Sequence, residues 1–162
     1  MSTLPFSDRP YRHGVGIMLL NSSGKVFVAQ RIDTPGAWQM PQGGIDLNED
    51  PLQTAFREME EEIGTRNAHC IGQTDGWVHY DLPHKLADKV WKGKFRGQKQ
   101  KWFLMAFDGK DTDINIDTEH PEFNAWQWTD FDALTQMIVE FKRPLYEKVV
   151  TELRPLVKKH IA

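Results

Sequence analysis

One short segment, residues 50–64, specifies a helix at both of its ends. Asp50 suits the N-cap position, and Pro51 suits the first helical position, where its missing N–H costs nothing. Gln53 stands where a capping box has its second member. Gly64 suits the left-handed residue that follows many helices. The sequence therefore predicts a helix over Pro51–Ile63, and the rest of the chain must pack around it.

Two faces of this predicted helix carry different chemistry. The apolar residues recur at intervals of three and four and form a stripe for burial: Leu52, Ala55, Phe56, Met59 and Ile63. Four acids also crowd into its second half. At roughly 100° per residue, Glu58, Glu61 and Glu62 share one face about 120° from the stripe. Glu60 points elsewhere and is expected to be solvated.

These acids do not stabilise the helix that carries them. Like charges four residues apart, as in Glu58 and Glu62, cost roughly 0.2–0.5 kcal/mol. Carboxylates in the last turn also face the negative end of the helix dipole, at about 0.3–1 kcal/mol each when exposed. A bound cation would compensate, and oxygen ligands without His or Cys suit Mg²⁺, with Mn²⁺ as the alternative. The helix alone leaves a second interpretation open, a solvated acidic face.

Composition and charge narrow the class of protein. The chain has 162 residues, of which 40% are apolar and 27% charged, so we expect a folded domain with its own core. We treat residues 1–162 as a single domain. Acids crowd into residues 46–62 and bases into residues 89–101. This distribution suits a cation beside a polyanionic substrate, while two solvated faces are the plainer alternative.

Several classes of site are not expected. Cys70 is the single cysteine, which excludes an intramolecular disulfide, and its apolar neighbours predict that it is buried. Cys and His residues show no zinc-binding spacing, and nothing indicates an organic cofactor. The first ten residues lack the apolar core of a signal peptide, and no apolar run has the length of a membrane span. We expect a cytoplasmic protein.

The hydrophobic pattern predicts a mixture of strands and helices. Strands are expected at 13–21, 25–31, 68–80, 100–107 and 124–129, and further helices at 131–138 and 142–160. Residues 35–47 and 83–98 are expected to be loops, and Pro155 is expected to kink or end the last helix. Because strands and helices do not alternate strictly, we predict an α+β fold with a mixed sheet between helices.

Residues 43–65 resemble the Nudix box. Gly43, Glu49 and the run from Arg57 to Gly64 match every fixed position of that motif. The last position is usually a bulky aliphatic residue and is Thr65 here, which weakens a packing contact and leaves the chemistry intact. The resemblance implies a loop–helix–loop on an α/β/α sandwich. It also implies an enzyme in which water attacks a phosphorus atom of a nucleoside diphosphate linkage.

The same resemblance implies a role for each residue of the motif. The implied ligands of a divalent metal are the carbonyl of Gly43 and the carboxylates of Glu58, Glu61 and Glu62. Glu49 and Arg57 would pair and hold the loop against the helix, and Gly64 would end that helix. These three roles are structural. Which carboxylate accepts the proton of the attacking water stays open.

The flanking sequence is similar to a narrower group, the bacterial RNA pyrophosphohydrolases and dinucleoside polyphosphate hydrolases. The likeness lies in residues 11–12, 30–31, 38–44, 80–83, 97–103, 121–123, 126–128 and 141–143. It implies that the substrate is RNA with a 5′-triphosphate end, a dinucleoside polyphosphate such as diadenosine tetraphosphate, or both. No DNA or membrane partner is implied, and protein partners are left undetermined.

Substrate contacts follow from this narrower resemblance. Arg12, Arg31 and Lys142 would bind phosphates. Lys99 is a candidate because of the basic stretch at residues 89–101 and not because of the resemblance. That stretch fits the polyphosphate chain or the RNA backbone, which makes binding sensitive to salt, and it equally fits a solubilising loop. Without the resemblance, each of these bases is more simply read as a solvated surface residue.

Three further residues complete the implied site. Glu122 would be an additional catalytic carboxylate that binds the metal or a water, although an isolated acid after proline is more often a surface residue. Tyr80 and Phe141 would flank a base, and a stacked base contributes roughly 1–3 kcal/mol. Core packing explains either aromatic residue equally well.

Two other functions stay open at this point. A small-molecule pyrophosphatase acting on nucleotide sugars or dNTPs would not need the basic stretch at residues 89–101. A non-catalytic binder or sensor with the same fold would usually have lost glutamates of the box, all of which are present. Metal-dependent turnover of any polyphosphate would exclude the binder.

Overall fold

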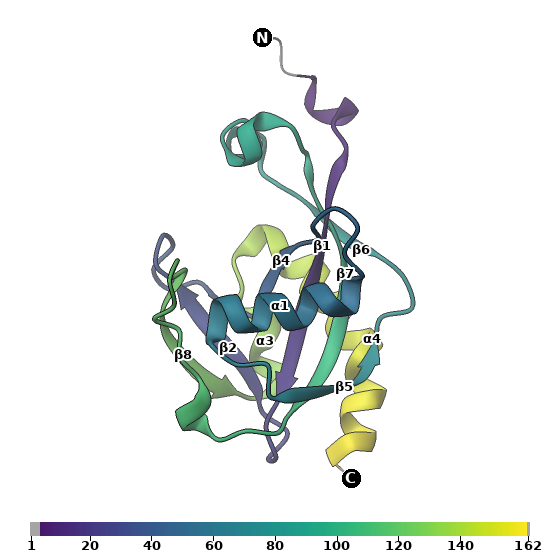
Figure 1. The fold of residues 1–162 in the computed structure, drawn as a ribbon. Helices are drawn as coiled ribbons and strands as arrows, with labels where there is room; N and C mark the ends of the chain where they lie inside the picture. The colour runs from purple at the N-terminus through teal and green to yellow at the C-terminus, as the bar shows by residue number, and fades with distance from the viewer. Residues whose placement is uncertain (1–3, 162) are drawn as a thin grey trace.

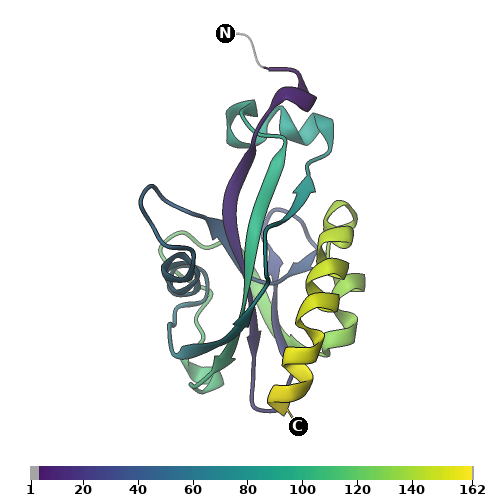
Figure 2. The same cartoon turned by 90° about the vertical axis from the view of Figure 1, so that its right-hand side faces the viewer.

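A mixed β-sheet lies between helices on its two faces in the computed structural model, which describes residues 4–161 (Figure 1). Residues 1–3, part of the N-terminal stretch considered above, and Ala162 lie outside the described residues. Seen edge-on, α1 covers one face and the C-terminal helix α4 covers the other (Figure 2). The predicted α+β architecture is therefore confirmed.

The strands are β1 Tyr11–Leu20, β2 Val26–Arg31, β3 Trp38–Gln39, β4 Gln42–Gly44, β5 Ala68–Gln73, β6 Val78–Asp81, β7 Gly97–Phe107 and β8 Phe123–Thr129. The α-helices are α1 Pro51–Ile63, α2 His84–Ala87, α3 Leu134–Met137 and α4 Arg143–Ile161. Short 3₁₀ turns are η1 Phe6–Asp8, η2 Val90–Gly93, η3 Asp111–Asp113, η4 Phe131–Ala133 and η5 Glu140–Lys142.

The centre of the sheet is the parallel pair β1 and β7, which stay in register from Tyr11 opposite Gly97 to Leu20 opposite Ala106. Every other described pairing is antiparallel. The strands lie in the order β3-β2-β1-β7-β5, and β4 pairs with β1, β6 with β7 and β8 with β2. The first half of β1 pairs with the short strand β4, whereas its far end pairs with β2. This arrangement sets β4, and with it Gly43, beside the middle of the sheet.

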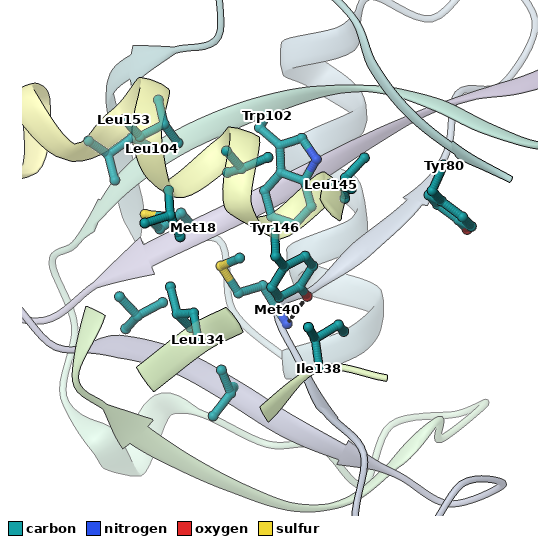
Figure 3. Close-up of a cluster of buried hydrophobic side chains, with 14 of the residues drawn as sticks. Met18, Met40, Tyr80, Trp102, Leu104, Leu134, Ile138, Leu145, Tyr146 and Leu153 are labelled. Atoms are coloured by element: carbon teal, nitrogen blue, oxygen red, sulfur yellow. Dashed lines mark hydrogen bonds between the residues drawn. The ribbon is translucent and has the colours of Figure 1, made fainter. Parts of the chain in front are cut away.

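Alternate residues of the central strands enter two separate cores, as the period of two requires. On one face, Met18 and Leu20 of β1 pack with α3 and α4 (Figure 3). On the other face, Ile17 and Leu19 pack with α1. In the first core the hydroxyl oxygen of Tyr146 accepts a hydrogen bond from the backbone N–H of Met40, which ties α4 to the β3–β4 segment (Figure 3).

Helix α1 occupies the predicted residues, with the predicted ends. The Asp50 carboxylate accepts hydrogen bonds from the N–H groups of Leu52 and Gln53, and Gly64 has a left-handed φ of 78°. The stripe predicted for burial faces the sheet: Ala55, Met59 and Ile63 are fully buried, and Leu52 and Phe56 are half-buried against the same core. Packing therefore fixes which way the acidic face points.

Several predicted boundaries differ from the structure. The predicted loop at 35–47 contains β3 and β4, which are too short to leave a periodic signal. The predicted strand at 68–80 is two strands, because the chain turns between Gln73 and Val78. The predicted loop at 83–98 holds α2 and η2 and ends inside β7. Cys70 is half-buried rather than buried.

Pro155 neither ends nor breaks α4, which continues to Ile161. The prediction rested on the cost of a proline inside a helix, about 3 kcal/mol. Packing outweighs that cost, because the buried face of α4 extends past Pro155 to Val157. Among the helices of residues 4–161, none combines the length and the apolar character that a membrane span requires.

Candidate active site

A cavity of about 610 Å³, here called the main cavity, collects most of the side chains that the sequence singled out. Its predicted acids are Glu58, Glu61, Glu62 and Glu122, its predicted cations are Arg12, Arg31 and Lys142, and Asp33 is a further acid that lines it. Tyr80, Phe141 and Gly43 also line it. These residues come from both halves of the chain, so the fold brings together groups that the sequence presents far apart.

The α1 carboxylates differ in burial. Glu58 and Glu62 are buried, whereas the side chain of Glu61 is 57% exposed. Glu58 lies against Gly43 of β4, where a Cβ would come within 2.0 Å of its carboxyl carbon. A glycine at this point therefore lets the carboxylate of α1 approach the backbone of β4.

Burial and mutual repulsion work against ionisation of the two inner carboxylates. Burial raises the pKa of Glu58 to about 7, an effect that the neighbouring Arg57 opposes. Burial also raises the pKa of Glu62, and the nearby charges of Glu122 and Glu58 raise it further. In addition, Oε2 of Glu62 is buried without a hydrogen-bond partner. Buried carboxylates that repel one another, one of them with an oxygen that lacks a hydrogen-bond partner, fit a site that receives a cation.

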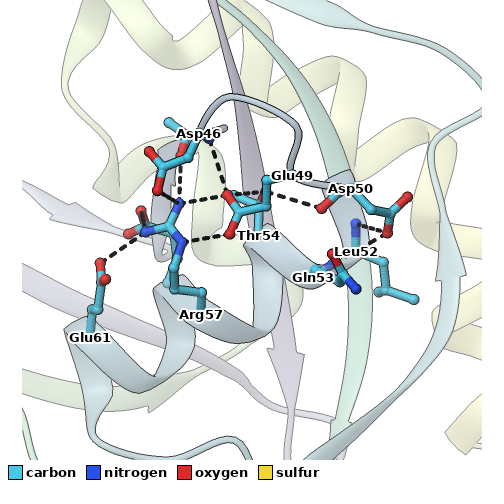
Figure 4. A network of polar contacts seen from close by, with 10 residues as sticks. Asp46, Glu49, Asp50, Leu52, Gln53, Thr54, Arg57 and Glu61 are labelled. Atoms are coloured by element: carbon cyan, nitrogen blue, oxygen red, sulfur yellow. Dashed lines mark hydrogen bonds and ion pairs between the residues drawn. The ribbon is translucent and has the colours of Figure 1, made fainter.

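Arg57 is the centre of the polar network on α1 (Figure 4). Its Nε donates to Oε2 of Glu49 at 2.7 Å, and its Nη2 donates to Oε1 of the same carboxylate at 2.9 Å. Nη2 also donates to the carbonyl of Gly44 at 2.9 Å. The loop before α1 is thereby held against the helix, and the hydrogen bonds from Arg57 lower the pKa of Glu49 to about 2.

The same guanidinium also reaches the α1 acids. Its Nη1 donates to Oε1 of Glu58 at 3.0 Å and to Oε2 of Glu61 at 3.1 Å. Among residues 4–161, no three His, Cys, Asp or Glu side chains form a group that could hold a metal ion as they stand. Arg57 already neutralises Glu58 and Glu61 through these contacts. A metal at Glu58 and Glu61 would have to replace these hydrogen bonds.

The three predicted phosphate-binding cations have different surroundings. Arg12 lies over the ring of Trp91, 5.0 Å from its centroid, and Arg31 forms a two-point ion pair with Asp33 at 2.8 Å. Lys142 is buried, and burial together with the charge of Arg31 lowers its pKa to about 8. Within residues 4–161 Lys142 forms no salt bridge, so an anionic ligand would be its charge partner.

The two predicted base-flanking residues line the main cavity side by side. Their ring centroids are 6.0 Å apart, and the rings are tilted by 47°. Tyr80 is almost fully buried, whereas Phe141 is half-buried. Nζ of Lys142 lies 5.1 Å from the ring centroid of Tyr80. The rings touch each other instead of enclosing a slot, so a base would stack on an exposed ring face and not between them.

Lys99 does not line the main cavity. In β7 it is flanked by Gln98 and Gln100, whose side chains point toward the α4 side of the sheet. The period of two turns Lys99 to the α1 side, between His13 of β1 and His79 of β6. Its expected contact with the phosphates therefore has no support from this geometry.

Other lining residues were not anticipated from the sequence. Gln42 and Gln98 face the main cavity, and so does Trp91, which underlies Arg12. The alternation of Gln98, Gln100 and Trp102 could have indicated an inward-facing set. This set was missed because residues 83–98 were predicted as a loop, whereas β7 already begins at Gly97.

Comparisons with known proteins give matches that extend over most of the chain. A family model described as "NUDIX domain" matches residues 10–149. A Rhodospirillum rubrum protein named RNA pyrophosphohydrolase is 63% identical over 144 residues, covering 89% of this chain and 87% of that protein. A Rickettsia typhi protein of the same name is 50% identical over 97% of this chain and 98% of its own length.

Among solved structures, Escherichia coli dihydroneopterin triphosphate pyrophosphohydrolase superposes with a TM-score of 0.66. It shares 20% identity, and the match covers 88% of this chain and 99% of that one. At this identity the likeness concerns the fold alone, and it agrees with the mixed sheet between helices described above.

Proposed function

This chain belongs to the NUDIX domain family, and from that premise we propose that it removes pyrophosphate from the 5′-triphosphate end of RNA. The observation that carries the proposal is the content of the main cavity. Buried carboxylates, the cations Arg12, Arg31 and Lys142, and two aromatic rings line one space. A substrate that combines a polyphosphate with an exposed 5′ nucleotide uses all three kinds of group. We also propose that the reaction takes place in the cytoplasm.

The acids of the main cavity fit a divalent metal, which the family uses generally, and we propose Mg²⁺. Glu58, Glu62 and the carbonyl of Gly43 would hold it, with Glu122 beside them. Glu61 would join after giving up its hydrogen bond from Arg57. A bound divalent cation would neutralise phosphate oxygens and lower the pKa of water. Mn²⁺ is the alternative, since it prefers the same oxygen ligands.

The cations of the main cavity would hold the phosphate chain during the reaction. Lys142 contributes a buried charge that forms no salt bridge within residues 4–161, and Arg12 contributes a guanidinium that packs over the ring of Trp91. Arg31 is already paired with Asp33, so it would share its charge between that acid and the substrate. Positive charges aimed at phosphoryl oxygens stabilise the charge that develops there in the transition state.

The bond changes then follow from this arrangement. The oxygen of a water attacks the α-phosphorus, the bridging P–O bond to the β-phosphate breaks, and pyrophosphate leaves. One carboxylate of the Glu58, Glu62 and Glu122 group accepts the proton of the water. RNA with a 5′-monophosphate is the second product. The ring face of the half-buried Phe141 would hold the first base by stacking, with Tyr80 packed beside it.

Diadenosine tetraphosphate presents the same succession of a nucleoside and a phosphate chain. We therefore propose that the site also accepts dinucleoside polyphosphates, with a lower kcat/KM than RNA. Nucleotide sugars and dNTPs would be poorer still, because they offer either fewer phosphates or no following nucleotide.

The test is a comparison of kcat/KM with Mg²⁺ at matched concentrations of 5′-triphosphate RNA, diadenosine tetraphosphate and dGTP. The proposal expects the highest value for RNA, with pyrophosphate as the released product. A clear preference for the dinucleotide would make this an enzyme of nucleotide clearance. A preference for dGTP or a nucleotide sugar would replace the proposal with that of a small-molecule pyrophosphatase.

A further inference from the structure

One segment of the chain projects beyond the sheet and also borders the main cavity. Residues 83–96, here called the cap, join β6 to β7 and contain α2 and η2 (Figure 1). The backbone N–H of Leu82 donates to the carbonyl of Arg96 at 2.8 Å and closes the base of the cap. Three side chains of the cap line the main cavity: Leu86, Val90 and Trp91. No step of the proposed reaction gives these residues a role of their own.

The cap is attached to the chain just before β1. The buried side chain of Arg9 donates from Nη2 to Oδ1 of Asp88 at 2.6 Å. The backbone N–H of Arg96 donates to the carbonyl of Pro10 at 3.0 Å. Because Arg12 follows two residues after Pro10, the cap and the side chain of Arg12 are anchored to the same short stretch of chain.

Two consecutive residues of the cap have a left-handed backbone, which glycine adopts without strain. Trp91 has a φ of 52° and Lys92 has a φ of 59°. Among residues 4–161, Asn48 is the one other residue besides the glycines with a positive φ. A bulky side chain in this region is strained, and such strain persists where surrounding contacts compensate for it, often at functional sites.

The indole of Trp91 makes such a contact through its ring face. Cζ of Arg12 lies 5.0 Å from the ring centroid, within the range of a cation–π interaction. The same guanidinium lies against Gly44 of β4, where a Cβ would come within 2.2 Å of its Nη2. Two segments that are far apart in the sequence therefore hold one side chain of β1.

Arg12 differs from the other arginine of the proposed phosphate site in what holds it. Arg31 forms an ion pair with Asp33, which occupies part of its guanidinium. Arg12 forms no salt bridge within residues 4–161. An aromatic face orients the plane of a guanidinium and takes none of its N–H groups, whereas a carboxylate would accept from them. Stacking on Trp91 thus leaves the donors of Arg12 available to a phosphate.

We propose that Trp91 is a positioning residue that holds the guanidinium of Arg12 toward the substrate phosphates, and that the left-handed turn at Trp91 and Lys92 places the indole there. This inference rests on the proposed function for the identity of the phosphate compound. It adds a residue that acts on the substrate only through Arg12, and it gives the cap a role in substrate binding.

A double-mutant cycle tests whether Trp91 acts through Arg12. Trp91→Leu removes the aromatic face and keeps an apolar side chain in the wall of the main cavity. We expect KM for 5′-triphosphate RNA to rise by about three- to tenfold, the equivalent of one cation–π contact, with a smaller change in kcat. Arg12→Gln should raise KM at least as much, and adding Trp91→Leu to it should have no further effect. Additive increases in KM would overturn the inference.

Two matched variants separate this role from general packing. Trp91→Phe keeps a smaller aromatic face and should recover most of the wild-type KM. Trp77→Leu, the same substitution at an exposed tryptophan that does not line the main cavity, should leave KM unchanged. Equal KM values for Trp91→Phe and Trp91→Leu would contradict a role for the ring face.

The turn is tested at Lys92, whose side chain is exposed and does not line the main cavity. Lys92→Gly and Lys92→Val remove the same charge, but glycine tolerates a positive φ whereas a β-branched residue does not. We expect a wild-type KM in Lys92→Gly and a raised KM in Lys92→Val. Melting temperatures show whether each variant folds, and this pair decides the matter if Trp91→Leu does not fold. Equal KM values for the pair would overturn the role of the turn.

Binding of inorganic triphosphate with Mg²⁺ separates this inference from the proposed function. Titration calorimetry should show weaker binding by Trp91→Leu than by the wild type, and no further weakening when Trp91→Leu is added to Arg12→Gln. That result would support the inference even if RNA proves not to be the substrate. If RNA is hydrolysed as proposed but Trp91→Leu binds triphosphate as tightly as the wild type, the proposed function stands and this inference fails.

Discussion

The carboxylate of Glu58 rests directly on the backbone of Gly43, with space for no side chain between them: a Cβ at position 43 would lie 2.0 Å from its carboxyl carbon and 2.3 Å from each oxygen. This contact joins α1 to β4, the two elements that would supply the metal ligands. It also explains why the motif requires glycine here even though the backbone of Gly43 is not left-handed.

Gly43→Ala should therefore impair catalysis without unfolding the protein. The new methyl group must displace Glu58, and a shift of about 1 Å in a catalytic group costs roughly 10²-fold in rate. We expect a fall of this size in kcat with a small change in melting temperature. Gly76→Ala is the matched control, because nothing lies within 4 Å of a Cβ at that position. Equal activity of the two variants would mean that Glu58 is not needed where it lies.

Acid should break the ion pair between Glu49 and Arg57. The pKa of Glu49 is lowered from an ordinary value of 4.5 to about 2 by the hydrogen bonds from Arg57. A carboxylate with a lowered folded-state pKa adds stability above its unfolded-state value and loses it as the pH falls through the folded-state value. Glu49→Gln should thus melt at a lower temperature than the wild type at pH 7. The difference in melting temperature should shrink between about pH 4.5 and pH 2. A difference that is constant with pH would mean that this ion pair does not stabilise the protein.

Lys142 should make substrate binding sensitive to alkaline pH. Because burial lowers its pKa to about 8, the free enzyme loses this charge as the pH rises through that value. We expect KM for 5′-triphosphate RNA to increase above pH 8 in the wild type. Lys142→Arg keeps a charge at these pH values and should flatten this increase. Lys142→Ala should raise KM at pH 7 more than it alters the melting temperature, and an unchanged KM would remove Lys142 from the phosphate site.

The hydrogen bond between Tyr146 and Met40, two residues far apart in the sequence, should stabilise the folded protein (Figure 3). Tyr146→Phe leaves the buried N–H of Met40 without a partner, which costs about 1–3 kcal/mol. Urea unfolding should register that loss in the free energy of unfolding. Because Met40 lies just before β4, a lower kcat is also expected. An unaltered free energy of unfolding would mean that another acceptor replaces the phenol.

Helix α1 could be predicted residue by residue because its information is local. Asp50, Pro51 and Gly64 each satisfy a requirement of a helix end, and the apolar stripe of period 3.6 supplies the buried face. The motif resemblance then indicated the family. The position of the main cavity could not be predicted in this way, since it depends on which strands become neighbours.

The errors arose where tertiary packing overrides local sequence. Pro155 lies within an unbroken helix because the buried face of α4 continues beyond it. Strand β4 is too short to show periodicity and is formed by pairing with β1. The hydrogen bonds from Arg57 to Glu58 and Glu61 also depend on side-chain positions, which helical angles alone do not give.

The most direct test of the central claim is kcat for 5′-triphosphate RNA at saturating Mg²⁺, measured for Glu62→Gln beside Glu60→Gln. Both substitutions remove one charge from α1, but Glu62 is buried in the main cavity whereas Glu60 is exposed outside it. We expect Glu62→Gln to lose a factor on the order of 10²–10⁴, the range for a missing catalytic carboxylate, and Glu60→Gln to match the wild type. Equal rates for the two variants would contradict the assignment of the α1 carboxylates as the catalytic centre.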